Sequence, residues 1–187
     1  MSQRAPDSAV VRSCEEMVRP LYAGLDGVQT FDRVERVRAR IEILAEGAAD
    51  LDHEVLEILV LLHGVGTRLG PLGPGGRLDL FLAAQGIEES RRLRIRRGLE
   101  RFASAPRRAE ERLLHDAVLL EEAGVPAAVG RLMAAGKKRR PARQAVESLD
   151  PGPAEERFAT AAGRAWGGRD RRTTIRWIEE LRGYFSS

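Results

Sequence analysis

The chain has 187 residues, enough for a domain with a buried core, and 43% of them are hydrophobic. Its 31 basic and 28 acidic side chains nearly cancel, so the formal net charge of +3 excludes a polycation. No apolar run approaches the ~20 residues that span a bilayer, and Met1–Pro6 contains no apolar signal core. We therefore expect a cytoplasmic globular protein with no membrane partner. The single cysteine, Cys14, excludes an internal disulfide, and we expect it to pack in the core.

Three helices are predicted in the first third of the chain. No stretch alternates with a period of two, whereas helical periodicity is widespread. The first helix is expected over residues 8–25, and the second begins near Thr30, a good N-cap, and ends near Gly47. The third covers residues 52–63 and has apolar side chains on every side, the pattern of a helix at the centre of a core.

The remaining segments are also predicted to be helical, after a loop at residues 64–76 that is too rich in Gly and Pro for a helix. Helices are expected at residues 77–85, 88–103, 106–123 and 126–135, and two more at the C-terminus on either side of Gly167 and Gly168, the last over residues 173–185. The fold class is therefore all-α. We expect one domain over residues 27–187, with an N-terminal helix, residues 1–26, packed on it.

Two basic runs stand out in the second half of the chain. In Arg91–Arg97 the arginines alternate with apolar residues, and we expect a solvated face balanced by the nearby Glu88, Glu89 and Glu100. The run Lys137–Arg140 is more concentrated and is expected in a loop, where it could contact phosphates. Neither run contains an aromatic residue, so a stacking platform for single strands is not expected.

Three short segments carry a further pattern: Phe31-Asp32-Arg33-Val34, Leu62-His63-Gly64-Val65 and His115-Asp116-Ala117-Val118. Their order and spacing resemble the HD superfamily of metal-dependent phosphohydrolases, whose metal site needs a histidine, a His-Asp doublet and a distant aspartate. The resemblance implies that Arg33 replaces the first histidine, Gly64 replaces the doublet aspartate, and Asp116 keeps the last ligand. Thr160, Arg164 and Arg169 fall where many bacterial members have a Thr…Arg…Arg pattern.

These replacements bear on the metal chemistry that the resemblance implies. A catalytic divalent ion needs about three or four protein ligands and an activated water. His63 and Asp116 supply two, Gly64 supplies none, and Arg33 is a permanent cation. We therefore expect no cofactor and no metal; if a metal binds, its ligands are His63 and Asp116. The resemblance also implies that His63 converges with Asp116 and that Arg33 pairs with Asp116.

The other two histidines offer few routes to a rebuilt metal site. His53 precedes His63 by ten residues on one predicted helix, which places them ~15 Å apart on different faces. His115 is expected at the surface or as a cap, because it points about a quarter-turn away from Asp116. His63 itself has an alternative interpretation, as a hydrogen-bonded histidine that closes a buried helix.

The function implied is that of a degenerate HD-fold protein without catalysis, which binds a small phosphate-bearing ligand or a protein partner. The remnant pocket would consist of Arg33, His63 and Asp116. The candidate phosphate contacts are Arg36, Arg68, Lys137 and Lys138. The alternatives are a metal-dependent phosphohydrolase with an atypical ligand set and a nucleic-acid-associated accessory protein.

Overall fold

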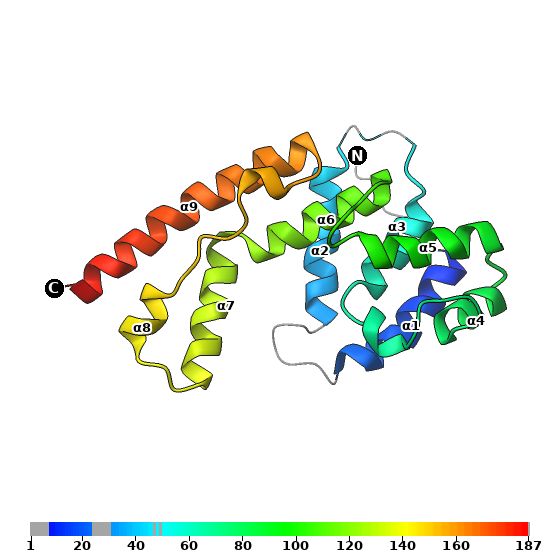
Figure 1. Cartoon of the computed structure of the whole chain (residues 1–187), viewed down its shortest axis with the longest axis horizontal. Helices are drawn as coiled ribbons and strands as arrows, with labels where there is room; N and C mark the ends of the chain where they lie inside the picture. The colour runs from blue at the N-terminus through cyan, green and yellow to red at the C-terminus, as the bar shows by residue number, and fades with distance from the viewer. Residues whose placement is uncertain (1–7, 24–30, 47, 49, 187) are drawn as a thin grey trace. The chain divides into compact units, whose positions relative to one another are not determined.

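The computed structural model describes residues 8–23, 31–46, 48 and 50–186, and within these ranges it contains helices and no strand (Figure 1). The predicted all-α class is confirmed. The chain forms two compact units, Met1–His115 and Asp116–Ser187, which divide within helix α6 (Ala109–Glu122). The boundary predicted near residue 26 lies inside the first unit, among residues outside the described ranges. Among the described helices, none is long and apolar enough to cross a membrane.

Helix α3 (His53–Leu62) lies at the centre of the first unit. Around it are α1 (Ala9–Ala23), α2 (Phe31–Leu44), η1 (Gly66–Leu69), α4 (Arg77–Ala84) and α5 (Glu89–Arg101). Helices α1, α2 and α5 pack directly against α3. The apolar side chains that surround α3 are all buried: Val55, Leu56, Ile58, Leu59, Val60, Leu61 and Leu62. Burial of each stabilises the fold by roughly 1.5–3 kcal/mol, and the prediction of a central core helix is confirmed.

Local signals explain where α3 begins and ends. Asp52 is its N-cap, and one carboxylate oxygen accepts a hydrogen bond from the backbone N–H of Val55 at 3.2 Å. At the other end the His63 N–H donates to the carbonyl of Leu59 at 2.9 Å. The chain then turns through η1, a short 3-10 helix inside the segment that was predicted to be entirely non-helical. A single turn of this kind needs only i→i+3 bonds, such as Arg68 N–H to Val65 O at 2.9 Å, and therefore tolerates glycine.

The structure tests only some of the predicted boundaries of α1 and α2. The signals at Thr30, Asp26, Gly27 and Gly47 lie outside the described residues. Cys14 on α1 is fully buried, as expected, and burial raises the pKa of its thiol to about 12. Helix α1 packs on α2 and α3; the division into residues 1–26 and a domain over 27–187 stays a prediction.

The second unit contains the end of α6, α7 (Gly124–Lys137), α8 (Ala142–Glu147), η2 (Glu155–Arg157) and α9 (Ala161–Ser186). Its small core comprises Ala128, Leu149 and Ile178, against which Leu132, Trp177 and Leu181 pack. Helix α9 contacts α7, α8 and η2. The short elements α8 and η2 were not predicted.

Helix α9 corrects the prediction of two C-terminal helices. It runs without a break through Gly167 and Gly168. A Cβ atom on Gly167 would overlap the ring of Phe158, and one on Gly168 would overlap the carboxylate of Glu155. The two glycines therefore allow the η2 segment to approach the helix closely, and they do not end it.

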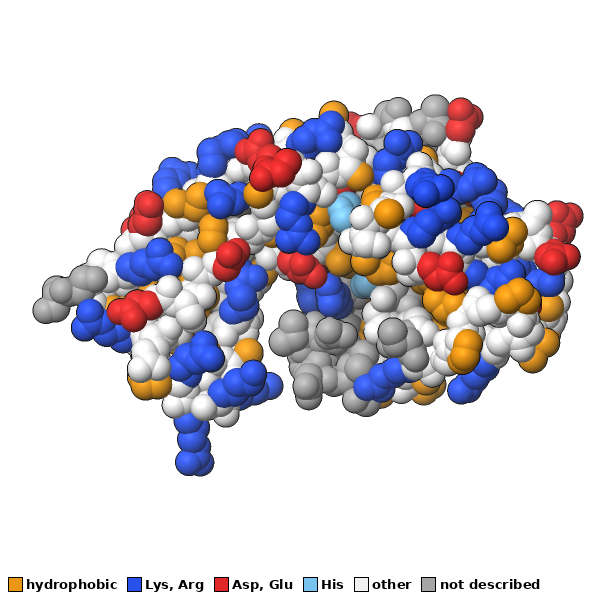
Figure 2. Space-filling view, in the orientation of Figure 1, with side chains coloured by type: hydrophobic (Ala, Val, Ile, Leu, Met, Phe, Trp, Pro, Cys, Tyr) orange, Lys and Arg blue, Asp and Glu red, His pale blue; other side chains and the backbone are white. Residues whose placement is uncertain are grey.

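Charged side chains of both signs lie across the face drawn in Figure 2.

Candidate ligand site at the end of helix α3

His63 closes α3 with one ring nitrogen bonded and the other unpaired. Its Nδ1 lies 2.6 Å from the carbonyl oxygen of Val60, which can only accept, so Nδ1 carries the proton and donates. Nε2 is consequently a lone-pair acceptor. It is buried and makes no hydrogen bond within the described part of the chain. A buried acceptor without a partner costs about 1–3 kcal/mol, so the unpaired Nε2 needs an explanation.

The surroundings of His63 keep its ring neutral. The pKa of His63 is lowered to about 4, mainly by burial and to a smaller extent by the charge of Arg33, against the opposing effect of the Val60 hydrogen bond. The Phe102 ring stands edge-on to the imidazole, with centroids 6.4 Å apart. Near neutral pH, Nε2 is therefore available to accept a hydrogen bond. The interpretation of His63 as a hydrogen-bonded helix-closing residue is confirmed; its role in a ligand pocket stays a prediction.

Tyr22 of α1 is the residue that sequence reasoning missed at this site. Its buried hydroxyl donates to the carbonyl of Leu61 at 3.0 Å and accepts from the backbone N–H of Gly64 at 3.2 Å. Burial raises the pKa of Tyr22 to about 12, while the Gly64 hydrogen bond and the charge of Arg33 act in the opposite direction. Tyr22 thus caps the end of α3 from another helix, and no local pattern in the sequence signals such a contact.

The same tyrosine fills the space that a side chain at position 64 would need. A Cβ atom on Gly64 would lie 2.9 Å from the Tyr22 hydroxyl oxygen and 3.0 Å from its Cε1. An aspartate could not enter here without displacing the ring. With Gly64 blocked and the cation Arg33 beside His63, these residues do not fit a divalent metal site of the kind that the HD resemblance implies. The described residues also contain no group of three His, Cys, Asp or Glu side chains that could hold an ion.

Three predicted basic residues share the first unit with His63. Arg33 is half-buried on α2 and close enough for its charge to act on both His63 and Tyr22. Arg68, on η1, donates to the carbonyl of Leu21 at 3.2 Å, next to Tyr22 in sequence. Arg36 is exposed on α2. Of these three, Arg33 is the cation whose charge is shown to act at the end of α3.

Asp116 belongs to the second unit, where it anchors the start of α9. The carboxylate is fully buried, and three groups donate to it: Ala159 N–H at 2.7 Å, Thr160 N–H at 2.9 Å and the Thr160 hydroxyl at 2.6 Å. The Thr160 oxygen in turn accepts from Gly163 N–H at 2.9 Å, as an N-cap does. These donors satisfy the carboxylate within its own unit. The predicted convergence with His63 and the predicted pairing with Arg33 stay predictions.

The other motif residues have structural partners. Arg164 donates to the carbonyl of Phe158 at 2.9 Å, and the Arg169 guanidinium lies over the Trp166 ring, 5.0 Å from its centroid. His115 is buried, and its Nδ1 lies 2.7 Å from the carbonyl of Phe102, the C-cap of α5. His115 therefore acts as a cap, one of the two roles expected for it.

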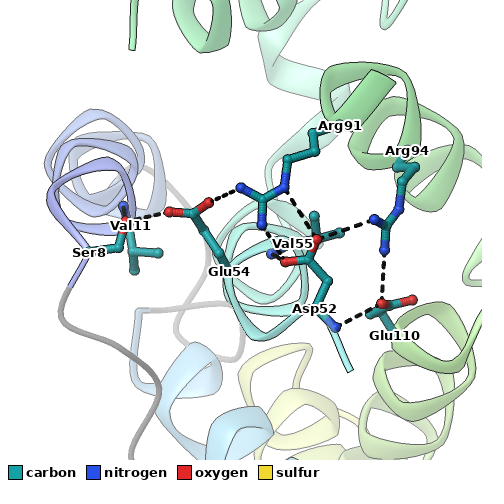
Figure 3. Close-up of polar contacts among 8 residues, drawn as sticks. All are labelled: Ser8, Val11, Asp52, Glu54, Val55, Arg91, Arg94 and Glu110. Carbon is teal, nitrogen blue, oxygen red and sulfur yellow. Dashed lines mark hydrogen bonds and ion pairs between the residues drawn. The ribbon is translucent and has the colours of Figure 1, made fainter. Parts of the chain in front are cut away.

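The expected role of the Arg91–Arg97 run is wrong for most of its arginines. Arg91 binds Asp52 at 2.7 Å and Glu54 at 2.6 Å, and Arg94 binds Asp52 at 3.2 Å and Glu110 at 3.0 Å (Figure 3). Arg92 and the buried Arg96 both pair with Asp79. The partners therefore lie outside α5 and are not the expected Glu88, Glu89 and Glu100, since α5 packs on α3 and α4. An open surface depression lies over Asp52, Glu54 and Arg91, but its two arginines are already paired with its acids, so we place no ligand there.

Comparisons with known proteins identify the fold class and no family. No protein-family model matches the chain, and no curated protein matches it. Solved structures of Bacillus subtilis YpgQ are similar over nearly the whole length. The complex of YpgQ with ADP has a TM-score of 0.64 and 15% identity over 92% of this chain and 93% of that chain. A second YpgQ structure has a TM-score of 0.61 and 15% identity over 92% and 95% of the two chains. This likeness shows a shared all-helical fold.

Proposed function

We propose that this protein is a degenerate HD-fold protein that binds a nucleotide-like phosphate ligand at the end of α3, without hydrolysis by a resident divalent metal. The observation that carries the proposal is the buried, unpaired Nε2 of His63 beside the charge of Arg33. Native proteins seldom leave such an acceptor unsatisfied, and a ligand is one explanation for it.

The chemistry of the site defines the ligand. The Arg33 guanidinium favours phosphate or carboxylate oxygens. The neutral Nε2 needs a hydrogen-bond donor, such as a ribose hydroxyl or the N–H of a base. A nucleotide offers both groups in one molecule. YpgQ, which shares the fold, has been crystallised in complex with ADP, so ADP is the first ligand to test.

The loss of catalysis rests on residue chemistry. Gly64 provides no ligand, and Tyr22 occupies the volume that a ligand there would need. The second candidate function, a metal-dependent phosphohydrolase with an atypical ligand set, retains His63 and Asp116 as its ligands. The two functions differ in one measurable outcome: a phosphohydrolase releases phosphate from the nucleotide when divalent metal is added, and a binding protein does not.

Calorimetric titration of ADP in a chelating buffer tests the proposal. We expect saturable binding that weakens about tenfold or more in Arg33→Gln and in His63→Leu, because each removes one polar partner worth about 1.5 kcal/mol or more. Arg97→Gln is the matched control, since it removes an equal charge from an exposed position on α5. Equal affinity in all four proteins, or no binding to any, would overturn the proposal.

A parallel assay of phosphate release separates the two functions. The wild-type protein should remain at background with added manganese or magnesium. Turnover that requires both the metal and His63 would favour the phosphohydrolase.

A further inference from the structure

A cluster of cations at the turn between α7 and α8, here called the basic turn, is not used by the proposed ligand site. It consists of Lys137, Lys138, Arg139, Arg140 and Arg143, all of which are exposed. Figure 2 shows basic side chains gathered at this end of the second unit, where Figure 1 draws α7 and α8.

The whole net charge of the protein comes from this unit. The first 115 residues carry eighteen basic and eighteen acidic side chains, whereas residues 116–187 carry thirteen and ten. Between Ala123 and Val146 the sequence contains six basic residues and no acidic one. Elsewhere, the Arg91–Arg97 run shows how this fold neutralises its arginines with acids of neighbouring helices. The basic turn lacks that compensation along its own sequence.

Few interactions hold the cations of the turn. Arg143 pairs with Glu147 at 2.9 Å, an exposed pair on one helix that contributes little, and Arg140 contacts the neutral Ser148 hydroxyl at 3.4 Å. For Lys137, Lys138 and Arg139, no ion pair forms with any acid in the described ranges. Three adjacent charges are thus available to a partner.

The backbone holds one of these charges in a strained conformation. Arg139 has φ +54°, and its N–H donates to Gly136 O at 2.8 Å while Arg140 N–H donates to Ala135 O at 3.1 Å. This pattern ends a helix, and glycine is the usual residue at its left-handed position. Arginine is strained there, because its Cβ atom crowds the backbone in the left-handed region. A long cation kept at a position that favours glycine points to a use for its charge.

We propose that the basic turn is a docking surface for the phosphodiester backbone of double-stranded nucleic acid, read without regard to sequence. The negatively charged phosphates of a duplex are suitable ion-pair partners for consecutive lysine and arginine side chains. Residues 134–145 contain no aromatic side chain for base stacking, which argues against a single strand. These residues also contain no large apolar side chain, and the exposed Met133 of α7, one turn before Lys137, is by itself a small apolar surface for a lipid bilayer, which argues against a membrane.

Fluorescence anisotropy of a labelled DNA duplex with the full-length protein tests this inference. If three cations contact phosphates, log affinity should fall against log salt with a slope of about −2.7 or steeper, so a fourfold rise in salt weakens binding about 40-fold. The triple variant K137A/K138A/R139G should bind at least about tenfold more weakly and lose that part of the slope. Glycine at position 139 adopts the same left-handed backbone conformation, so a loss of binding in this variant reports the loss of charge and not a change in the fold.

The matched control is R77A/R97A/R108A, which removes three exposed arginines from the first unit. It should change duplex affinity by less than about threefold, the shift expected from net charge alone. The single variant R139G should raise the melting temperature while it weakens binding, a combination that a purely structural role would not produce. Equal losses in both triple variants, no duplex binding at low salt, tighter binding to a single strand, or turn-dependent binding to anionic vesicles alone would each overturn the inference.

Discussion

The hydroxyl of Tyr22 and the backbone of Gly64 meet at the C-terminal end of α3, joined by a 3.2 Å hydrogen bond across 42 residues of sequence. The tyrosine also donates to Leu61, so one side chain serves both a carbonyl and an N–H that the helix end leaves unpaired. An aspartate at position 64, the residue type that the HD resemblance leads one to expect there, would clash with this tyrosine. The absence of a side chain at Gly64 is therefore matched by the Tyr22 ring, which fills the adjacent space.

The first prediction concerns this steric fit. Gly64→Ala should lower the free energy of unfolding by about 1–3 kcal/mol, because the new methyl group meets the Tyr22 hydroxyl oxygen at 2.9 Å and ring atom Cε1 at 3.0 Å. Gly66→Ala is the control, since a Cβ there meets nothing within 4 Å, and it should stay within about 0.5 kcal/mol of wild type. In a Tyr22→Leu background the cost of Gly64→Ala should shrink by more than about 0.5 kcal/mol. Denaturant unfolding measures the stability of the three single variants and of the Tyr22→Leu/Gly64→Ala double variant. If the effects of Tyr22→Leu and Gly64→Ala simply add, the two residues are not in contact.

The second prediction concerns the anchor of α9. Thr160→Val removes the hydroxyl that donates to Asp116 at 2.6 Å and accepts from Gly163 at 2.9 Å. Since a buried carboxylate loses a donor, unfolding should become easier by about 1.5–3 kcal/mol. Thr160→Ser keeps the hydroxyl and should recover most of that loss. Thermal denaturation of the two variants checks this, and a Thr160→Val protein as stable as Thr160→Ser would rule out the anchor.

The third prediction tests the closeness of α9 to the same carboxylate. A Cβ on Gly163 would overlap Oδ2 of Asp116, so Gly163→Ala should destabilise the protein by about 1–3 kcal/mol or more. Gly130→Ala, on α7, meets nothing within 4 Å and should instead stabilise the helix by about 0.5–1 kcal/mol. Thermal denaturation checks both variants, and a Gly163→Ala protein that melts at or above the wild-type temperature would show that the packing around Asp116 is looser than described.

The fourth prediction is a pH dependence from His63. Its pKa is about 4 in the folded protein and 6.5 when unperturbed. Between these values the unfolded chain binds more protons, so this group makes the free energy of unfolding rise with pH up to about 6.5 and stay level above. His63→Asn keeps a donor for Val60 but does not titrate. The stability gap between wild type and this variant should therefore narrow as pH falls from neutral towards 4, and a constant gap would show that His63 is not buried in the neutral form.

Local patterns predicted the helices but not the contacts between them. The apolar run of α3 has side chains on all sides, so its position at the core follows from hydrophobicity alone. The pair Gly167-Gly168 was expected to end a helix, because glycine is common at helix ends. Its structural role is instead to admit Phe158 and Glu155, which belong to an earlier segment, so the local sequence does not show it. The arginines of α5 likewise form ion pairs with acids outside their own helix, such as Asp52 and Asp79. Tyr22 is the same kind of case: nothing near it in sequence indicates that it will meet Gly64.

The last prediction asks whether the end of α3 can be converted into a metal site. On the HD resemblance, Arg33→His with Gly64→Asp restores the family's ligand types. The structure adds a condition, because Tyr22 occupies the space that the new aspartate needs. The double variant should therefore bind no manganese or be poorly folded. The triple variant, which also carries Tyr22→Leu, should fold and bind manganese in isothermal titration, with affinity that falls below neutral pH as the histidines take up protons. The matched control replaces Gly64→Asp by Gly66→Asp in the triple background and places the same charge two residues away, where it should restore no binding. A folded triple variant without manganese affinity would mean that the ancestral ligand geometry is absent and that the HD interpretation of Arg33 and Gly64 is wrong.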